Sequence, residues 1–182
     1  MEGIAGNRSA PSSIPIAKIA DGPVGLILSR NVNNYSNFSS EYVSQHPDND
    51  LANRKREAGI DEASFANLSI AMLKMHFPKL TLARNVDNPP LPAYIVYDED
   101  WPPVRGQLVG VTFMRVITLV IVDAQGAIIQ TITGRGSGEW SGAIEAIGEA
   151  RKKVDRAMRH AHEIALSQLD AQLNEKLSSS KR

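Results

Sequence analysis

Several residue types and patterns are scarce or missing in this 182-residue sequence, and each narrows the class of protein. It has no cysteine, which excludes disulfides, thiolate metal sites and a cysteine nucleophile and leaves both reducing and oxidising compartments open. Aromatic residues make up only 5% of the chain, so the core must be built from Val, Ile, Leu and Ala. The 20 basic residues are balanced by 20 acidic ones, so we expect no nucleic-acid partner.

Long apolar runs are also missing. The apolar run Val116–Val122 is far shorter than the roughly 20 residues that span a bilayer. The first residues, MEGIAGNRSAPSSIPIAK, lack a basic region followed by an apolar one, so they do not form a secretory signal. Their small and polar residues are typical of a tether or a processed N-terminus, or equally of an ordinary frayed end.

The length fits one domain with tails. We expect a flexible N-terminal segment over 1–20, a single α+β domain over 21–170 and a polar C-terminal tail over 171–182. The stretch 30–60 is polar and has no clean period, which predicts a long loop inside the domain.

The periodicity of the apolar residues predicts the order of helices and strands. Strands are expected at GPVGLILS, KLTLARN, PAYIVYDEDW, VGVTFMRVITLVIVDA and AIIQTIT, and helices at IDEASFANLSIAMLKMHF and over about 141–177. This order predicts an α+β fold, a two-layer sandwich in which helices pack on one face of a mostly antiparallel sheet and the C-terminal helix is long.

Two local patterns make sharper predictions. In the first helix, one set of residues recurs at helical spacing and should face the core: Phe65, Leu68, Met72 and Met75. His76 lies at the edge of that stripe, where a partly buried, hydrogen-bonded histidine is expected rather than a ligand or base. Asp123 and Gly126 are the residues preferred at the ends of a type I turn, so the two strands beside them should form a hairpin.

The glycine-rich stretch TGRGSGEWSG is the first candidate site. If it formed a loop before a helix, the backbone of Gly134, Gly136 and Ser137 could hold a phosphate, with Arg135 as its side-chain partner. The stretch lacks the Lys-Ser/Thr pair of a P-loop and follows a hairpin strand instead of opening a parallel unit. The favoured interpretation is structural: the glycines let a strand bend before a helix that Ser137 or Ser141 caps.

Other candidate residues are aromatic, acidic or histidine. Tyr97, Trp101 and Trp140 are candidate interaction residues, whereas the acids of YDEDW place at most two carboxylates on one side of a strand and make a weak cation site. His160 and His162 lie about 200° apart around a helix axis, so no metal site is expected. No nucleophile motif such as GxSxG or SxxK is present, so we expect neither an enzyme nor a cofactor.

The segment YIVYDEDWPPVRGQLVGVTFMRVITLVIVDAQGAIIQTITGRGSG, followed by a long helix, resembles the small α/β periplasmic domains of Gram-negative envelope lipoproteins. Its layout is similar to the N-terminal domain of the Tol-system propeller protein and to the curli-secretion lipoprotein. The resemblance covers roughly residues 92–165 and implies a non-enzymatic scaffold in the periplasm or at the outer membrane. The chain lacks the lipidated cysteine of such proteins, so any membrane contact would come through an N-terminal lipid anchor that has been removed.

The favoured hypothesis is therefore an envelope domain, periplasmic or associated with the outer membrane, that binds other envelope proteins through a sheet edge, the 30–60 loop or the C-terminal helix. Self-association through that helix could accompany this role. The alternative is a cytosolic domain that binds a small molecule or nucleotide on the Gly134–Gly138 backbone.

Overall fold

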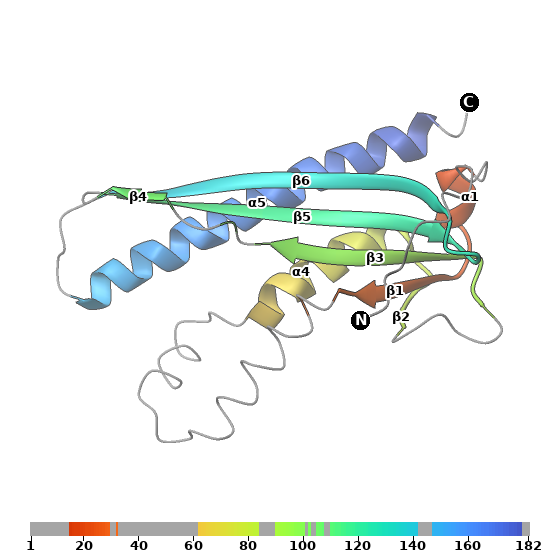
Figure 1. The fold of residues 1–182 in the computed structure, drawn as a ribbon, viewed down its shortest axis with the longest axis horizontal. Helices are drawn as coiled ribbons and strands as arrows, with labels where there is room; N and C mark the ends of the chain where they lie inside the picture. Colours follow the sequence, from red (N-terminus) through yellow and green to blue (C-terminus); the bar gives the residue numbers. More distant parts are fainter. Residues whose placement is uncertain are drawn as a thin grey trace, which may run out of the picture.

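The computed structural model describes residues 15–29, 32, 62–83, 90–100, 102, 105–107, 110–141 and 147–179. Most of the expected 30–60 loop lies outside these residues. The helices of the described part are α1 (Ile16–Ala20), α4 (Glu62–His76) and α5 (Ile147–Ser179). The strands are β1 (Val24–Leu28), β2 (Leu80–Leu82), β3 (Ala93–Asp100), β4 (Arg105–Gln107), β5 (Gly110–Asp123) and β6 (Ile128–Ser141) (Figure 1).

All six strands belong to one mixed sheet. β1 lies between β2 and β3 and is parallel to both, whereas β5 is antiparallel to β3, β4 and β6. The prediction of a mostly antiparallel sheet is confirmed. The two parallel pairs of β1 were not predicted. The pair of β1 and β2 can form because α4 lies between these strands in the chain and lets β2 run in the same direction as β1. β2, β4 and β6 each pair with a single strand, so each has one side without a strand partner in the described part of the chain.

The helices pack on one face of the sheet, as predicted. One side of β5 is fully buried at Ile117, Leu119 and Ile121, and all three described helices contribute residues to the apolar cluster on that side. The intervening side chains, from Val116 to Val122, are half-buried. In Figure 1, α5 runs diagonally across β5 and β6. No helix in the described ranges has the length and apolarity of a bilayer-spanning segment.

The buried face of α4 differs from the predicted stripe. Among the side chains of α4 whose burial is described, the buried ones are Phe65, Ser69, Met72 and Leu73. The side chains of Leu68 and Met75, which were expected to face the core, are 45% and 72% exposed. Relative to the predicted stripe, the helix is rotated about its axis, so that the row of Phe65, Ser69 and Leu73 faces the interior. A pattern of apolar residues alone does not predict this face, because one of its buried residues is a serine.

The hairpin between β5 and β6 has the predicted turn. Gly126 N donates to Asp123 O at 3.0 Å and adopts a φ of 82°, which glycine tolerates best. The Asp123 carboxylate also accepts from the backbone N–H groups of Gln125 and Ala127, at 3.0 and 2.8 Å. The aspartate therefore fixes the turn with its side chain as well as its backbone.

Three expected boundaries are wrong. Ile16–Ala20, assigned to a flexible segment, form α1, whose Ile16 and Ile19 are buried. The last helix was expected from about Ser141, but β6 runs to Ser141 and α5 begins at Ile147. α5 then continues to Ser179 with Leu173 fully buried, so 171–179 are helix and not a tail.

Candidate functional site

The glycine-rich segment is part of a strand and not a phosphate-binding loop. Gly134, Gly136 and Gly138 lie in β6 and are buried on the face toward α5. A Cβ at any of them would overlap the backbone carbonyl oxygen of one α5 alanine: Ala165, Ala161 and Ala157, respectively. The prediction that these glycines end a strand before a helix cap is also wrong, since Ser137 and Ser141 both lie within β6.

The repeats of the two elements explain this close packing. Alternate residues of a strand are about 6.6–6.8 Å apart, and residues four apart in a helix are about 6 Å apart. The spacing of the three glycines therefore matches the spacing of the three alanines, which follow in the opposite order along the chain. The glycines carry no side chain, so the two backbones lie close together. We call these six residues the glycine–alanine seam.

On the side of β6 that faces away from β5, glutamine side chains form hydrogen bonds with the backbone. Arg135 N donates to Gln168 Oε1 at 3.1 Å, and Gln172 Nε2 donates to Thr133 O at 2.9 Å, both from α5. Gln130 Nε2 donates to Thr131 O at 3.1 Å within the strand. The side chains of Arg135 and Ser137 are exposed on the strand, but the backbone N–H of Arg135 is already used, so the four residues of the predicted anion site form no cradle.

The three candidate interaction residues lie in different surroundings. Tyr97 is fully buried, so its prediction as an interaction residue is wrong. Trp101 lies outside the described residues. Trp140, near the end of β6, is half-buried, and its Nε1 is a buried donor with no acceptor among the described residues.

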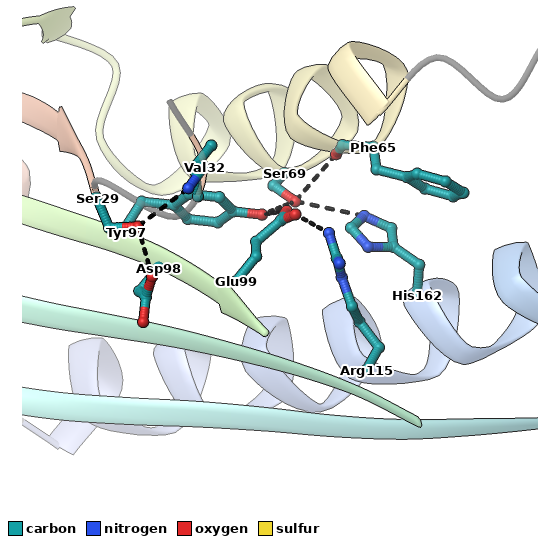
Figure 2. Close-up of polar contacts among 9 residues, drawn as sticks. All are labelled: Ser29, Val32, Phe65, Ser69, Tyr97, Asp98, Glu99, Arg115 and His162. Atoms are coloured by element: carbon teal, nitrogen blue, oxygen red, sulfur yellow. Dashed lines mark hydrogen bonds and ion pairs between the residues drawn. The ribbon is translucent and has the colours of Figure 1, made fainter. Parts of the chain in front are cut away.

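Tyr97 instead belongs to a buried polar network between the sheet and the helices (Figure 2). Its hydroxyl donates to Ser69 Oγ on α4 at 2.6 Å, and Ser69 in turn donates to Phe65 O at 3.1 Å and lies 3.4 Å from His162 Nε2 on α5. The phenol also contacts the Glu99 carboxylate. The hydroxyl groups therefore connect β3 with both long helices.

An ion pair completes the network on the sheet side. Arg115 of β5 is 1% exposed and pairs with Glu99 of β3, whose side chain is 9% exposed. Such a buried pair must be well matched, because removing two charges from water costs several kcal/mol each. Figure 2 shows the guanidinium between the Glu99 carboxylate and the His162 ring. The network therefore orients β3, β5, α4 and α5 relative to one another.

The surroundings shift two pKa values in this network. Burial, and secondarily the Arg115 charge, lower the pKa of His162 from 6.5 to about 4, so the imidazole is neutral at pH 7. Its ring packs against Phe65 with a centroid distance of 4.7 Å. Burial raises the pKa of Tyr97 well above its ordinary value, although the Ser69 hydrogen bond and Arg115 act in the opposite direction. Both groups stay uncharged beside the ion pair.

The histidines and acids form no metal cluster in the described part of the chain. His162 is buried and His160 is exposed, as expected from their positions around α5. His76 is partly buried and hydrogen-bonded, as predicted: its Nε2 lies 2.6 Å from Asp170 Oδ1. Of the acids in YDEDW, Asp98 accepts a hydrogen bond from the Ser29 hydroxyl. Glu99, the next residue, points into the interior and pairs with Arg115.

A surface groove lies between the end of β6 and the first half of α5. Its volume is about 480 Å³ and it is open to solvent. Its main lining residues are Glu139 and Trp140 from β6 and Lys153, Arg156, Arg159 and His160 from α5. Of the two candidate interaction residues that the structure describes, Trp140 lies at this open surface and Tyr97 does not.

At the β2 edge of the sheet, part of the backbone faces away from the neighbouring strand. Val24 N donates to Lys79 O and Ala83 N donates to Leu26 O, so the backbones of Lys79 and Ala83 face β1. Because this direction alternates along a strand, the backbone of Leu82 faces away from β1, where no described strand pairs with it. The Leu82 side chain is 68% exposed.

Comparison with family models and with curated proteins gave no match. Several solved structures are similar. The chain is 8% identical to the uncharacterised lipoprotein B of Nitrosomonas europaea, covering 89% of this chain and 90% of that one, with a TM-score of 0.46. It is 13% identical to a minor lipoprotein of Acinetobacter baumannii, with 88% and 92% coverage and a TM-score of 0.40.

A third solved structure is the hypothetical protein CT253 of Chlamydia trachomatis, at 12% identity, 88% and 99% coverage and a TM-score of 0.43. Two of these three neighbours are thus described as lipoproteins, and they come from Gram-negative bacteria. With identities under 25% and TM-scores under 0.5, these likenesses carry no argument about the side chains of the network or the groove.

Proposed function

We propose that this chain is a non-enzymatic protein-interaction domain of the cell envelope, and that its β2 edge binds an extended segment of another envelope protein. The observation that supports the interaction role is the β2 edge, which pairs with no described strand on its outer side and carries the exposed Leu82. The envelope part of the proposal comes from the resemblance of residues 92–165 to envelope lipoprotein domains.

A sheet edge selects a partner in extended conformation. The outward backbone groups of Leu82 can pair with an added strand, which gives affinity through main-chain hydrogen bonds. Leu80 N already donates to Phe77 O at 2.9 Å, so among the described residues of β2 the added strand would pair mainly at Leu82. The short β2 therefore suits a short segment that side-chain contacts also hold.

Apolar side chains near this end of the molecule can supply those contacts. Leu82 is 68% exposed, and Met75 in the last turn of α4, close before β2 in the chain, is 72% exposed. Methionine adapts to differently shaped apolar partners. A partner strand with apolar residues on one side would remove both from water.

Photo-crosslinking in the source cell tests the proposal. A photoreactive amino acid at position 82 should capture an envelope protein, while the same residue at position 128 should not. Ile128 is a matched control because it is 55% exposed and apolar but lies at the start of β6, near the other edge. Leu82→Lys should abolish capture by a probe at position 75, since a charged edge residue opposes strand addition.

Two outcomes would contradict the proposal. Equal capture from positions 82 and 128 would mean that the β2 edge has no special role. Recovery of the chain in the cytosol, with an intact mass that shows no processing or lipid, would exclude the envelope part. If the captured protein were a second copy of the chain, the β2 edge would serve self-association and not an envelope partner.

A further inference from the structure

The groove between β6 and α5 is a second surface, at the opposite edge of the sheet from β2. We propose that it binds an acidic, extended segment of a partner protein. Its α5 wall carries Lys153, Arg156, Arg159 and His160, and its β6 wall carries Trp140. No ion pair links Arg156 or Arg159 to another described residue, and both are exposed, so their guanidinium groups are available.

The spacing of the cations favours an extended peptide. Lys153, Arg156 and Arg159 recur every third residue and His160 follows, so they lie along one side of α5. From position 153 to 160 the helix rises about 10 Å, which is the length of about three extended residues. Carboxylates on alternate residues of a strand share a face about 6.6 Å apart, so two of them fit within this length. A segment with acids at alternate positions can therefore place two carboxylates along the row.

The other groove residues restrict the ligand further. Arginine binds carboxylates with two parallel hydrogen bonds, and an indole offers an apolar face on which a peptide side chain can pack. Glu139 and Glu163 also line the groove. These two carboxylates would repel a continuous anionic membrane surface, whereas a peptide can place neutral residues against them. The mixture of charges thus favours an acidic polypeptide over lipid head groups.

Fluorescence anisotropy with a labelled peptide tests this inference on the full chain. The probe is Gly-Asp-Phe-Asp-Phe-Asp-Gly, and the comparison peptide has Asn in place of each Asp. We expect saturable binding of the Asp peptide, at least tenfold weaker binding of the Asn peptide, and a loss of at least tenfold for the double variant Arg156→Glu with Arg159→Glu.

The control variant carries Lys18→Glu and Lys74→Glu, which changes the net charge by the same amount at two exposed positions on α1 and α4. It should bind the Asp peptide within about twofold of the parent. Leu82→Lys should also leave peptide binding unchanged, so failure of the β2 proposal and failure of this one give different results.

Several results would overturn the inference. Equal losses in the two double variants would mean that only overall charge matters. Equal affinity for the Asp and Asn peptides would exclude carboxylate recognition. Binding to vesicles with phosphatidylglycerol, without peptide binding, would make the groove a lipid site. A dimer that the Arg156→Glu and Arg159→Glu double variant dissociates, and that excludes the peptide, would make a second copy the occupant.

Discussion

Two edges of the sheet, at β6 and at β2, are built in opposite ways. At β6, α5 covers the strand so closely that only glycine fits at Gly134, Gly136 and Gly138, and glutamine side chains bond the outward backbone groups at Thr133 and Arg135. At β2, three residues form the whole strand, and the outward backbone of Leu82 has no strand partner in the described part of the chain.

The difference shows how one chain covers one edge with its own helix and leaves another without a strand partner among its described residues. β6 and α5 are neighbours in sequence, so the chain itself supplies a permanent cover for a long, flat edge that would otherwise invite aggregation. β2 is short, which limits unwanted pairing and still leaves room for a specific strand. Each prediction below changes one side of this comparison.

The largest expected effect comes from filling the glycine–alanine seam. Gly136→Val should reduce the free energy of unfolding by about 3 kcal/mol or more, because the new side chain would overlap the Ala161 carbonyl and push α5 away from β6. Ser137→Val, at the next and exposed position of the same strand, should change it by less than about 0.5 kcal/mol. Urea denaturation measures both. Similar losses in the two variants would show that α5 does not contact β6 as described.

The next largest effect is the pH dependence of stability that the buried network joining α4, α5 and the sheet should produce. The pKa of His162 is about 4 in the folded chain and about 6.5 in an unfolded one, so between these values only the unfolded chain binds the proton. Stability is therefore complete above about pH 6.5 and falls as the pH drops to about 4. The total contribution is about 3 kcal/mol, since one pKa unit corresponds to about 1.4 kcal/mol.

His162→Gln removes this titration, so the difference in stability between parent and variant should shrink by most of that amount from pH 7 to pH 4. His160→Gln is the matched control, because His160 is exposed two residues earlier on α5. Chemical denaturation at several pH values measures the difference. A parent and a His162→Gln variant with parallel pH profiles would contradict the assignment.

A smaller effect should follow from opening the β6 edge. Gln168→Ala and Gln172→Ala each remove one hydrogen bond to the strand, so each should cost about 1 kcal/mol. Asn174→Ala is the control, since Asn174 bonds only Asp170 on its own helix and is exposed. In Gln168→Ala the amide of Arg135 should also exchange with deuterium faster. Unchanged exchange would mean that the glutamine does not protect the edge.

The sequence was most informative where a local residue type determines the backbone. Asp123 and Gly126 predicted the hairpin correctly, because the turn depends on an acceptor side chain and on a residue that tolerates positive φ. Alternation and helical periodicity likewise predicted β1, β2, β3, β5, the first half of β6, the long last helix and the helix-covered face, but not β4. These features depend on neighbours within a few residues.

The glycine–alanine seam was missed because its two halves lie in different elements. A signal was nevertheless present: glycine at every second position of residues 134–138, and alanine at every fourth position at Ala157, Ala161 and Ala165. Each pattern alone is common in its own context. Only the close match between the two repeat lengths predicts that the elements pack against each other.

The network was missed for a related reason. Arg115 lies on the same side of β5 as Ile117, Leu119 and Ile121, so a charged residue in a buried row required a buried partner. Glu99 was considered only as one of the acids of YDEDW, in a weak cation site. Ser69 interrupted the apolar stripe of α4 and shifted the predicted face. Polar residues in the interior follow their partners, which a hydrophobic pattern does not contain.

The smallest effect on stability is expected at the open edge, at the residue that the proposed function needs most. Leu82→Lys should change the free energy of unfolding by less than about 0.5 kcal/mol, because the side chain is already 68% exposed. Leu80→Ala, two residues earlier in β2, should cost about 2 kcal/mol or more, because Leu80 is 6% exposed and packs in the core. Urea denaturation compares the two. A cost above about 1 kcal/mol for Leu82→Lys would mean that Leu82 packs within its own chain, and the edge would then offer a partner less apolar surface than proposed.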